Sequence, residues 1–310
     1  MPRPIALAVD FGGTKVEAAL VDDRGTLLAG SRHRRPTGPT ADSGQLQRAV
    51  ADVVRGAHDA LPAGAELIGV GIGTAGPVDL RERTVSPLNV PAWRGHPLAA
   101  DVAALLPDVP VDLRIDGLCI VLAESWVGAG RGARNLLGMV VSTGVGGGLL
   151  LGGAAAPSPS GNSGHIGHIE VGGFDDLCAC GGHGCLEAIA SGPRTVAWAR
   201  RQGFTGETGE DLAVAHAAGD PVALAAVERA GTAIGRAIAS ATNLVDLDLV
   251  AIGGGFSRVS PALFDHARAA LAERTAFDFV QRTRIEPSGL SDEGPLIGAG
   301  ALVHRPQPLG

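Results

Sequence analysis

Residues 5–21 read Ile5-Ala-Leu-Ala-Val-Asp10-Phe-Gly-Gly-Thr-Lys15-Val-Glu-Ala-Ala-Leu-Val21. A short apolar run ends at an aspartate, a glycine turn follows, and the next run alternates as a returning strand does. Residues 137–151 repeat this layout, with the turn Thr143-Gly-Val-Gly-Gly147 between two expected strands. Because 310 residues suffice for two cores, the repetition predicts a duplicated α/β architecture with a cleft between its halves.

The remaining sequence alternates between short apolar runs and segments with helical spacing of their apolar residues. We expect the first third to form a hairpin-rich sheet with a crossover helix, and residues 192–243 to be mostly helical. Strands are predicted at 26–30, 67–73, 111–115, 137–142, 148–151 and 247–252. Helices are predicted at 43–60 with Ser43 as its cap, 118–127, 222–242, 261–274 and 296–302.

A second glycine-rich stretch carries the cysteines: Gly161-Asn-Ser-Gly-His165-Ile-Gly-His168, then Cys178-Ala-Cys180-Gly-Gly-His-Gly-Cys185-Leu-Glu187. One imidazole, that of His168, and three thiolates make a closed tetrahedral set of the kind that holds structural Zn²⁺. A catalytic zinc needs an open position for water, and this set leaves none. We therefore expect a metal that fixes a loop, with His165 and Glu187 projecting from it.

The alternative for these cysteines is a disulfide pair, or loop thiols without a partner. The chain has four cysteines, and the fourth, Cys119, lies in an apolar run typical of a buried core residue. No signal peptide and no membrane span is recognisable, which predicts a cytoplasmic protein without a membrane partner. A reducing cytoplasm favours metal over disulfide. Glycines flank the His165–His168 pair, which also lacks the glutamate of a metalloprotease helix.

Charge argues against a nucleic-acid partner. The formal net charge is −7, whereas polyanion binding requires a basic face. The short basic cluster 32–35 is interpreted as a solvated strand end.

The glycine motifs point to a nucleotide. Gly71-Ile-Gly73-Thr-Ala-Gly76 matches a dinucleotide fingerprint, but Pro77 and a charged segment follow where a helix is required. In Asp10-Phe-Gly-Gly-Thr-Lys15, by contrast, paired glycines present backbone amides, Thr14 offers a hydroxyl, and Asp10 is placed to hold Mg²⁺ through water. The alternative is an ordinary hairpin turn.

Two further glycine clusters support the nucleotide interpretation. The turn Thr143–Gly147 forms a second cradle for phosphate, and Gly253-Gly-Gly255 admits a flat ring against the backbone. A Walker-type loop is excluded because Lys15 is the only lysine. Together these motifs predict a nucleoside triphosphate bound across the cleft.

Taken together, the motifs resemble the ROK family of sugar kinases and repressors, within the actin-like ATPase superfamily. The resemblance covers nearly the whole chain, and its most specific part is the zinc segment 161–187. The other matching stretches are Asp10–Lys15, Gly73-Thr-Ala-Gly-Pro77, Asn89-Val-Pro-Ala-Trp93, Asp116 with Glu124, Ser142-Thr-Gly-Val-Gly-Gly147 and Gly253–Gly255.

The resemblance implies two α/β domains of the actin-like (ribonuclease H-like) type, 1–116 with 297–310 and 117–296, that close on a hexose. It also implies ATP as phosphoryl donor and a homodimer or homotetramer. Because no basic helix-turn-helix segment stands before the first strand, the kinase branch is expected rather than the repressor branch.

Site roles follow from the same resemblance. Asp116 is the expected catalytic base, taking the proton from the sugar's primary hydroxyl; the alternative role for this residue is a helix N-cap. The zinc-ligand histidine can also touch the sugar with its other nitrogen. Sugar contacts are expected from Gly76, Asn89, His165, His168 and Glu187; ATP and Mg²⁺ contacts from Asp10, Gly12, Gly13, Thr14, Lys15, Thr143, Gly144, Gly146, Gly254 and Gly255; and zinc ligation from His168, Cys178, Cys180 and Cys185.

Two departures from the family pattern bear on the substrate. Ile115 stands where most family kinases carry an Asn that bonds sugar hydroxyls, so a standard hexose would lose about 1–3 kcal/mol if those hydroxyls end buried and unpaired. His165 replaces the Glu of typical glucokinases, and a neutral imidazole can donate to the acyl oxygen of a 2-acetamido sugar. Some N-acetylmannosamine kinases of the family have His there.

The leading hypothesis is therefore a 6-kinase of a hexose or N-acetylhexosamine, N-acetylmannosamine first and glucose as the near competitor. One alternative is that His165 is a neutral, solvent-facing substitution. Two other classes of function stay open: a non-catalytic sugar sensor, with Ile115 as the mark of a decayed site, and a zinc-stabilised scaffold without a small-molecule ligand.

Overall fold

The computed structural model describes residues 2–290 and 292–306, which form two compact α/β units. The first contains the described residues up to Arg131, the segment Ala154–Ser163 and those from Asp292 onward; the second contains Gly132–Gly153 and the described residues from Gly164 to Leu290. The predicted two-part α/β organisation is confirmed. The predicted boundaries, 1–116 with 297–310 and 117–296, stay a prediction, and residues 307–310 lie outside the described part of the chain.

A five-stranded mixed sheet forms the centre of the first unit, in the order β3-β2-β1-β4-β7. Strands β1 and β2 form an antiparallel hairpin, whereas β1, β4 and β7 run parallel. Every residue of β1 from Ile5 to Phe11 is buried, because helices cover both faces of the sheet. The strands are β1 (Arg3–Phe11), β2 (Lys15–Asp22), β3 (His33–Pro36), β4 (Ala65–Thr74) and β7 (Val111–Ile115).

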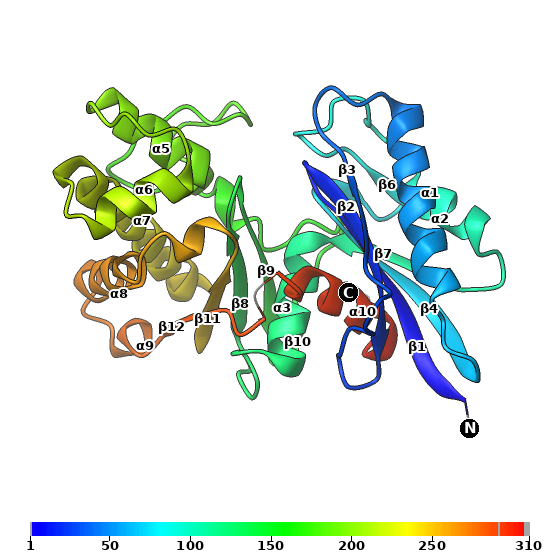
Figure 1. Ribbon diagram of the computed structural model, residues 1–310. Coiled ribbons are helices and arrows are strands. Elements are labelled where there is room, and N and C mark those ends of the chain that lie inside the picture. Colours follow the sequence, from blue (N-terminus) through cyan, green and yellow to red (C-terminus); the bar gives the residue numbers. More distant parts are fainter. Residues whose placement is uncertain (1, 291, 307–310) are drawn as a thin grey trace. The chain divides into compact units, whose positions relative to one another are not determined.

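Two pairs of helices cover this sheet, α1 (Ser43–Asp59) and α2 (Leu98–Leu105) on one face, α3 (Asp116–Val127) and α10 (Gly294–His304) on the other (Figure 1). Glycines let α10 approach closely: a Cβ built on Gly71 would lie 1.8 Å from the carbonyl oxygen of Ala299. The predicted apolar C-terminal helix is thus confirmed as part of the core of the first unit. A small hairpin, β5 (Val78–Asp79) and β6 (Thr84–Val85), completes the unit.

The second unit has the sheet order β9-β8-β11-β12, in which β8 and β9 form the antiparallel hairpin and β8, β11 and β12 run parallel. Its long helix α7 packs against α8 so closely that a Cβ on Gly235 would lie 2.1 Å from the carbonyl oxygen of Ala267. The strands are β8 (Leu136–Val141), β9 (Val145–Leu151), β11 (Leu249–Gly253) and β12 (Arg284–Pro287). The short β10 (Ala154–Ala155), which follows β9 in the chain, lies in the segment Ala154–Ser163 of the first unit. The helices are η1 (Ile166–His168, 3-10), α4 (Leu186–Ala190), α5 (Gly192–Arg201), α6 (Gly209–Ala217), α7 (Pro221–Val245), η2 (Phe256–Arg258, 3-10), α8 (Ala262–Arg274) and α9 (Asp278–Gln281).

Three local predictions are wrong. Residues 26–30 do not form a regular strand: Leu27 makes an isolated antiparallel bridge with Val21, and residues 29–30 form a turn. The cap of α1 is Asp42, not Ser43: its carboxylate accepts from the amide of Gln45 in a capping box. The turn between β8 and β9 is shorter than predicted, since Val145 already pairs with Val141.

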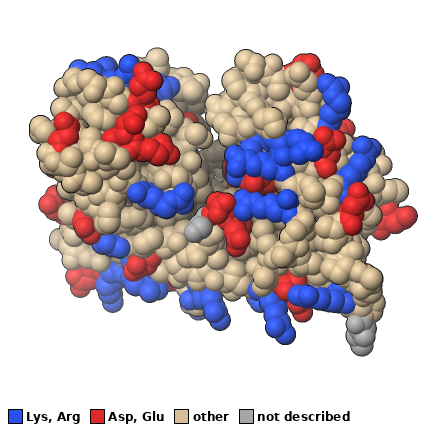
Figure 2. Space-filling model, viewed as in Figure 1, with Lys and Arg blue, Asp and Glu red and all other residues tan. Residues whose placement is uncertain are grey.

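Basic and acidic side chains are interspersed over the viewed face of each unit (Figure 2). Among residues 2–290 and 292–306, no helix combines the length and apolarity that crossing a bilayer requires.

Candidate active site and metal centre

The carboxyl ends of β1, β4 and β7 meet at one edge of the first sheet. Asp10 pairs in register with Gly73 of β4, and Thr74 pairs with Ile115 of β7, immediately before Asp116. Burial, followed by the negative charge of Asp116, raises the pKa of the Asp10 carboxyl to about 7. Two carboxylates that repel each other, that of buried Asp10 and that of half-buried Asp116, fit a hard divalent cation such as Mg²⁺, which favours oxygen ligands and keeps several waters.

Asp116 is the first residue of α3, and the N-cap position belongs to Ile115. Its Oδ1 accepts from the amide of Gly117 at 2.7 Å. The alternative role of Asp116 as the helix cap is therefore wrong, although the N-terminal end of the helix favours its negative charge. Ile115 itself is buried, at 3% exposure, in the apolar core of the first unit.

The first glycine turn is built partly from its own backbone bonds. The amide of Gly12 donates to the carbonyl of Lys15 at 2.9 Å, and Thr37 Oγ1 donates to the carbonyl of Gly12 at 2.8 Å. The Gly12 amide is thus engaged inside the turn, while Thr14 is exposed. Asn89 lies beside the turn, because a Cβ on Gly13 would stand 3.0 Å from its Cβ.

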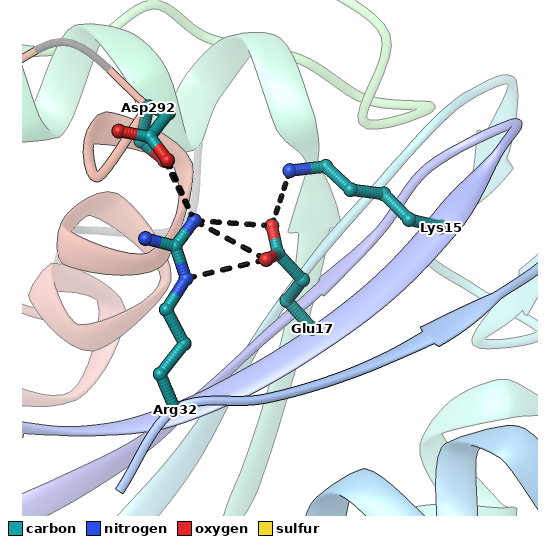
Figure 3. A network of polar contacts seen from close by, with 4 residues as sticks. All are labelled: Lys15, Glu17, Arg32 and Asp292. Atoms are coloured by element: carbon teal, nitrogen blue, oxygen red, sulfur yellow. Dashed lines mark hydrogen bonds and ion pairs between the residues drawn. The ribbon is translucent and has the colours of Figure 1, made fainter. Parts of the chain in front are cut away.

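Behind this turn lies a network of four charged side chains (Figure 3). The Lys15 ammonium contacts one oxygen of Glu17, and Arg32 Nε donates to the other at 3.2 Å. Arg32 Nη2 also reaches Asp292 Oδ2 at 3.0 Å. Burial alone would raise the pKa of the Glu17 carboxyl, but the hydrogen bonds and charges of Lys15 and Arg32 outweigh it and lower the pKa. In this conformation the Lys15 ammonium is paired with Glu17 of the same strand, β2.

The second glycine turn, Ser142–Gly144, opens onto a cavity of about 420 Å³ within the second unit. Thr143 and Gly255 line the cavity, next in the chain to Gly144 and Gly254. Gly254 has φ +97°, and a Cβ there would stand 2.5 Å from the carbonyl oxygen of Val141, so only glycine fits. Gly146 has no heavy atom within 4 Å of its Cβ position, which leaves room along β9.

Several lining residues of this cavity escaped the sequence analysis. Phe256 and Arg258 directly follow the Gly253–Gly255 cluster, and that adjacency was an available signal. The remaining ones come from α5, α6 and the segment before α6, where nothing in the sequence marks a ligand. They are Gly192, Pro193, Val196, Glu207, Thr208, Gly209, Glu210 and Ala213, and Val259 also lines the cavity directly after Arg258.

The predicted zinc ligands come together in the second unit. The ligand atoms of His168, Cys178, Cys180 and Cys185 all lie within 4.8 Å of one another. Cys180 and Cys185 have their sulfurs 3.7 Å apart, and His168 Nδ1 lies 3.7 Å from Cys178 Sγ. Four ligands at tetrahedral Zn–S and Zn–N lengths would stand about 3.6–3.8 Å apart, so the set fits Zn²⁺.

The chemistry of the thiols agrees with this fit. All four cysteines are free, and Cys119 is fully buried as predicted, so the disulfide alternative is wrong. Burial and the neighbouring Cys180 and Cys178 raise the pKa of the Cys185 thiol to about 12. The Cys185 thiol therefore loses its proton readily only to a cation that replaces it.

The predicted sugar contacts divide between the units, with Gly76 and Asn89 in the first and the others in the second. The His165 and His168 rings lie 5.6 Å apart, centroid to centroid. Burial, then the neighbouring His168, lowers the pKa of His165, which keeps its imidazole neutral at pH 7. Glu187 Oε2 accepts from the amide of Val145 at 2.9 Å, a contact that the sequence did not predict.

The family can now be assigned. The sequence pattern of the ROK family matches residues 6–306. This chain belongs to the ROK family. It is 29% identical to a glucokinase of Streptomyces coelicolor, over 98% of this chain and 99% of that one. It is 31% identical to an N-acetyl-D-glucosamine kinase of Yersinia pseudotuberculosis, over 95% and 97% of the two chains.

A solved structure supports the same relationship. The ROK family glucokinase of Streptomyces griseus, in complex with glucose and AMPPNP, superposes with a TM-score of 0.83 at 28% identity, covering 97% of this chain and 99% of that one. The two-domain ROK fold predicted from the sequence is thereby confirmed.

Proposed function

We propose that this ROK-family chain is an ATP-dependent sugar kinase that phosphorylates a hexose or N-acetylhexosamine at the 6-hydroxyl. The observation that carries the proposal is the meeting of Asp10 and Asp116 at the carboxyl ends of parallel strands, where burial and like charge raise the pKa of Asp10. Open α/β sheets bind their ligands at this edge. The named activities of the relatives support the same class.

In the proposed reaction, the sugar's 6-oxygen attacks the γ-phosphorus and the bond from that phosphorus to ADP breaks. Asp116 accepts the hydroxyl proton, and Asp10 holds the cation through water. The turns 11–14 and 142–144, with Gly146 on β9, would present amides and hydroxyls to the phosphates, and the cavity beside Thr143 and Gly255 would take the base. Magnesium, when bound, offsets charge on the transferring phosphoryl group.

For the sugar, we propose N-acetylmannosamine first, with glucose as an equally supported alternative. His165 lies beside His168 in the metal segment and can donate a hydrogen bond to an acyl oxygen. Ile115 offers no hydrogen bond and is packed into the core. The names of the relatives, glucokinase and N-acetyl-D-glucosamine kinase, favour neither choice.

ADP release with glucose, mannose, N-acetylglucosamine and N-acetylmannosamine in parallel tests both levels. We expect the highest kcat/KM with N-acetylmannosamine, and a shift toward glucose in His165→Glu, which restores an acceptor. Glucose as the best substrate of the wild type would establish the alternative. Sugar binding without ADP release, unaltered by Asp116→Asn, would instead make the protein a sensor, and the absence of any thermal shift with ATP would favour a scaffold.

A further inference from the structure

Both chain segments that carry the metal ligands also hold Val145, the residue that follows the second glycine turn. On one side, the Val145 amide donates to Glu187 Oε2 at 2.9 Å. Glu187 lies in the first turn of α4, whose N-cap is the metal ligand Cys185. A backbone amide bonded to a carboxylate is a charge-assisted hydrogen bond, stronger than a neutral one. The start of α4 is therefore tied to the turn.

From the other side, the turn carrying His168 lies directly against the same strand. A Cβ on Gly167 would stand 1.9 Å from the carbonyl oxygen of Val145, and one on Gly164 would stand 2.8 Å from the Cα of Gly148. Backbone touches backbone at both places. The amide and the carbonyl of Val145 are thus each held by a segment that the metal would join.

The far end of α4 holds the other side of the turn. The amide of Gly192 donates to the carbonyl of Ser142 at 2.8 Å, two residues after α4 ends. Within the turn, a Cβ on Gly144 would meet Glu187 Oε2 at 2.6 Å. Gly144 therefore gives the carboxylate the room it needs to reach the Val145 amide.

We propose that Glu187 is a positioning residue for the nucleotide, fixing the Ser142–Gly144 turn, and that metal bound at His168 and the three cysteines holds Glu187 in place. Zinc occupancy and nucleotide affinity are then coupled through one hydrogen bond and two backbone contacts. The inference rests on the proposed function, because it requires this turn to bind nucleotide. It goes beyond the sugar contact expected of Glu187, which would act only when sugar is present.

The deciding measurement is the Kd of AMPPNP for the zinc-loaded, full-length protein in the absence of any sugar. We expect Glu187→Ala to weaken binding about 10-fold, while Glu187→Gln, which keeps an acceptor oxygen, stays within about twofold of wild type. Glu228→Ala, on the exposed face of α7, is the matched control and should bind as wild type does. An unchanged Kd for Glu187→Ala overturns the inference.

A second variant does not depend on the folding of Glu187→Ala. Gly144→Ala places a methyl group where the carboxylate passes, so we expect a similar loss of AMPPNP affinity. Both changes disrupt the same interaction. The double variant should therefore bind AMPPNP no more weakly than whichever of the two single variants has the lower affinity. Fully additive losses would show that Gly144 acts independently of Glu187, and would overturn the proposed arrangement.

The metal side of the coupling has its own readout, the transfer of zinc to a chromogenic chelator. At equilibrium with the chelator, saturating AMPPNP should raise the zinc affinity of the protein by the same factor by which zinc raises its AMPPNP affinity, since coupling between two sites is reciprocal. Glu187→Ala should abolish this mutual effect. If AMPPNP does not change the zinc affinity, the inference is overturned but the proposed function is not. If the wild-type protein binds no AMPPNP, both the proposed function and the inference are overturned.

Discussion

The two glycine turns of this chain share a backbone plan and differ in what holds them. Each joins the two strands of an antiparallel hairpin, and a parallel strand lies beside the hairpin in the same sheet. The first turn is backed by the charges of Lys15, Glu17 and Arg32. The second is contacted by the two segments that carry the metal ligands, through Glu187 and Gly167. The first should therefore respond to pH, and the second to the loss of metal.

The largest effect is expected from breaking the metal side. Removal of zinc, or Cys185→Ser, should unfold the 161–190 segment and abolish activity, because structural zinc contributes on the order of 10 kcal/mol to the fold that it stabilises. Metal content by elemental analysis and hydrogen exchange of both units measure this. Cys119→Ala is the control and should retain the metal. Full turnover by verified metal-free protein would contradict a structural role for zinc.

Asp116→Asn tests the chemistry of the first unit without touching either turn. The amide keeps the size of the carboxylate and cannot accept the hydroxyl proton, so kcat should fall about 10²–10⁴-fold. The AMPPNP Kd should change little. A kcat within about threefold of wild type would remove Asp116 from the role of base.

Asp10→Asn separates stability from activity. The pKa of Asp10 is raised from 3.8 to about 7, so its ionisation costs the folded state free energy that grows as pH rises between these values. Without divalent cations, the variant should be more stable than wild type at pH 8 by about 2–4 kcal/mol and no more stable at pH 4. Urea unfolding measures this, with the exposed Asp52→Asn as control. A stability gain equal at both pH values would contradict the buried charge pair.

The smallest effect concerns the charges behind the first turn. Arg32→Gln should lower the free energy of unfolding by about 1–3 kcal/mol at neutral pH. Because the folded pKa of Glu17 lies below its ordinary 4.5, the network stabilises the fold above that pH, and its contribution is lost as pH falls through the folded pKa.

Arg35→Gln provides the matched control for this network. Arg35 pairs with exposed Asp52 at 3.3 Å, and such pairs contribute about 0–1 kcal/mol. Urea unfolding of the two variants at neutral and at low pH makes the comparison. Equal losses of unfolding free energy in Arg32→Gln and Arg35→Gln would show that the network around Glu17 stabilises the fold no more than an exposed ion pair does.

Local sequence signals predicted most of the fold. The buried runs of β1 and α7 are long and strongly patterned, and the ligand spacing of the metal site repeats a known chemistry, so these were found. Strand β12 has only four residues, of which Arg284 and Glu286 are charged, and it was missed. The segment 26–30 has the composition of a strand, but its pairing with β2 is limited to an isolated bridge between Leu27 and Val21.

In the candidate site, the sequence predicted which residues gather at the strand ends but not their partners. Arg32 and Asp292 are 260 positions apart, and the bond from Val145 to Glu187 spans 42. Such contacts depend on how whole elements pack, which local patterns do not encode. The same reason explains why Glu207 and Glu210 of the cavity carried no signal.

The placement of α10 also has a consequence for biosynthesis. The N-terminal sheet is completed by a helix made from the last described stretch of the chain, whereas every element of the second unit precedes Asp292. Domains that emerge first from the ribosome generally fold first, but here strands β1, β2 and β4 are synthesised long before α10, which packs against them. The nascent chain is thus expected to need chaperone protection at its beginning for longest.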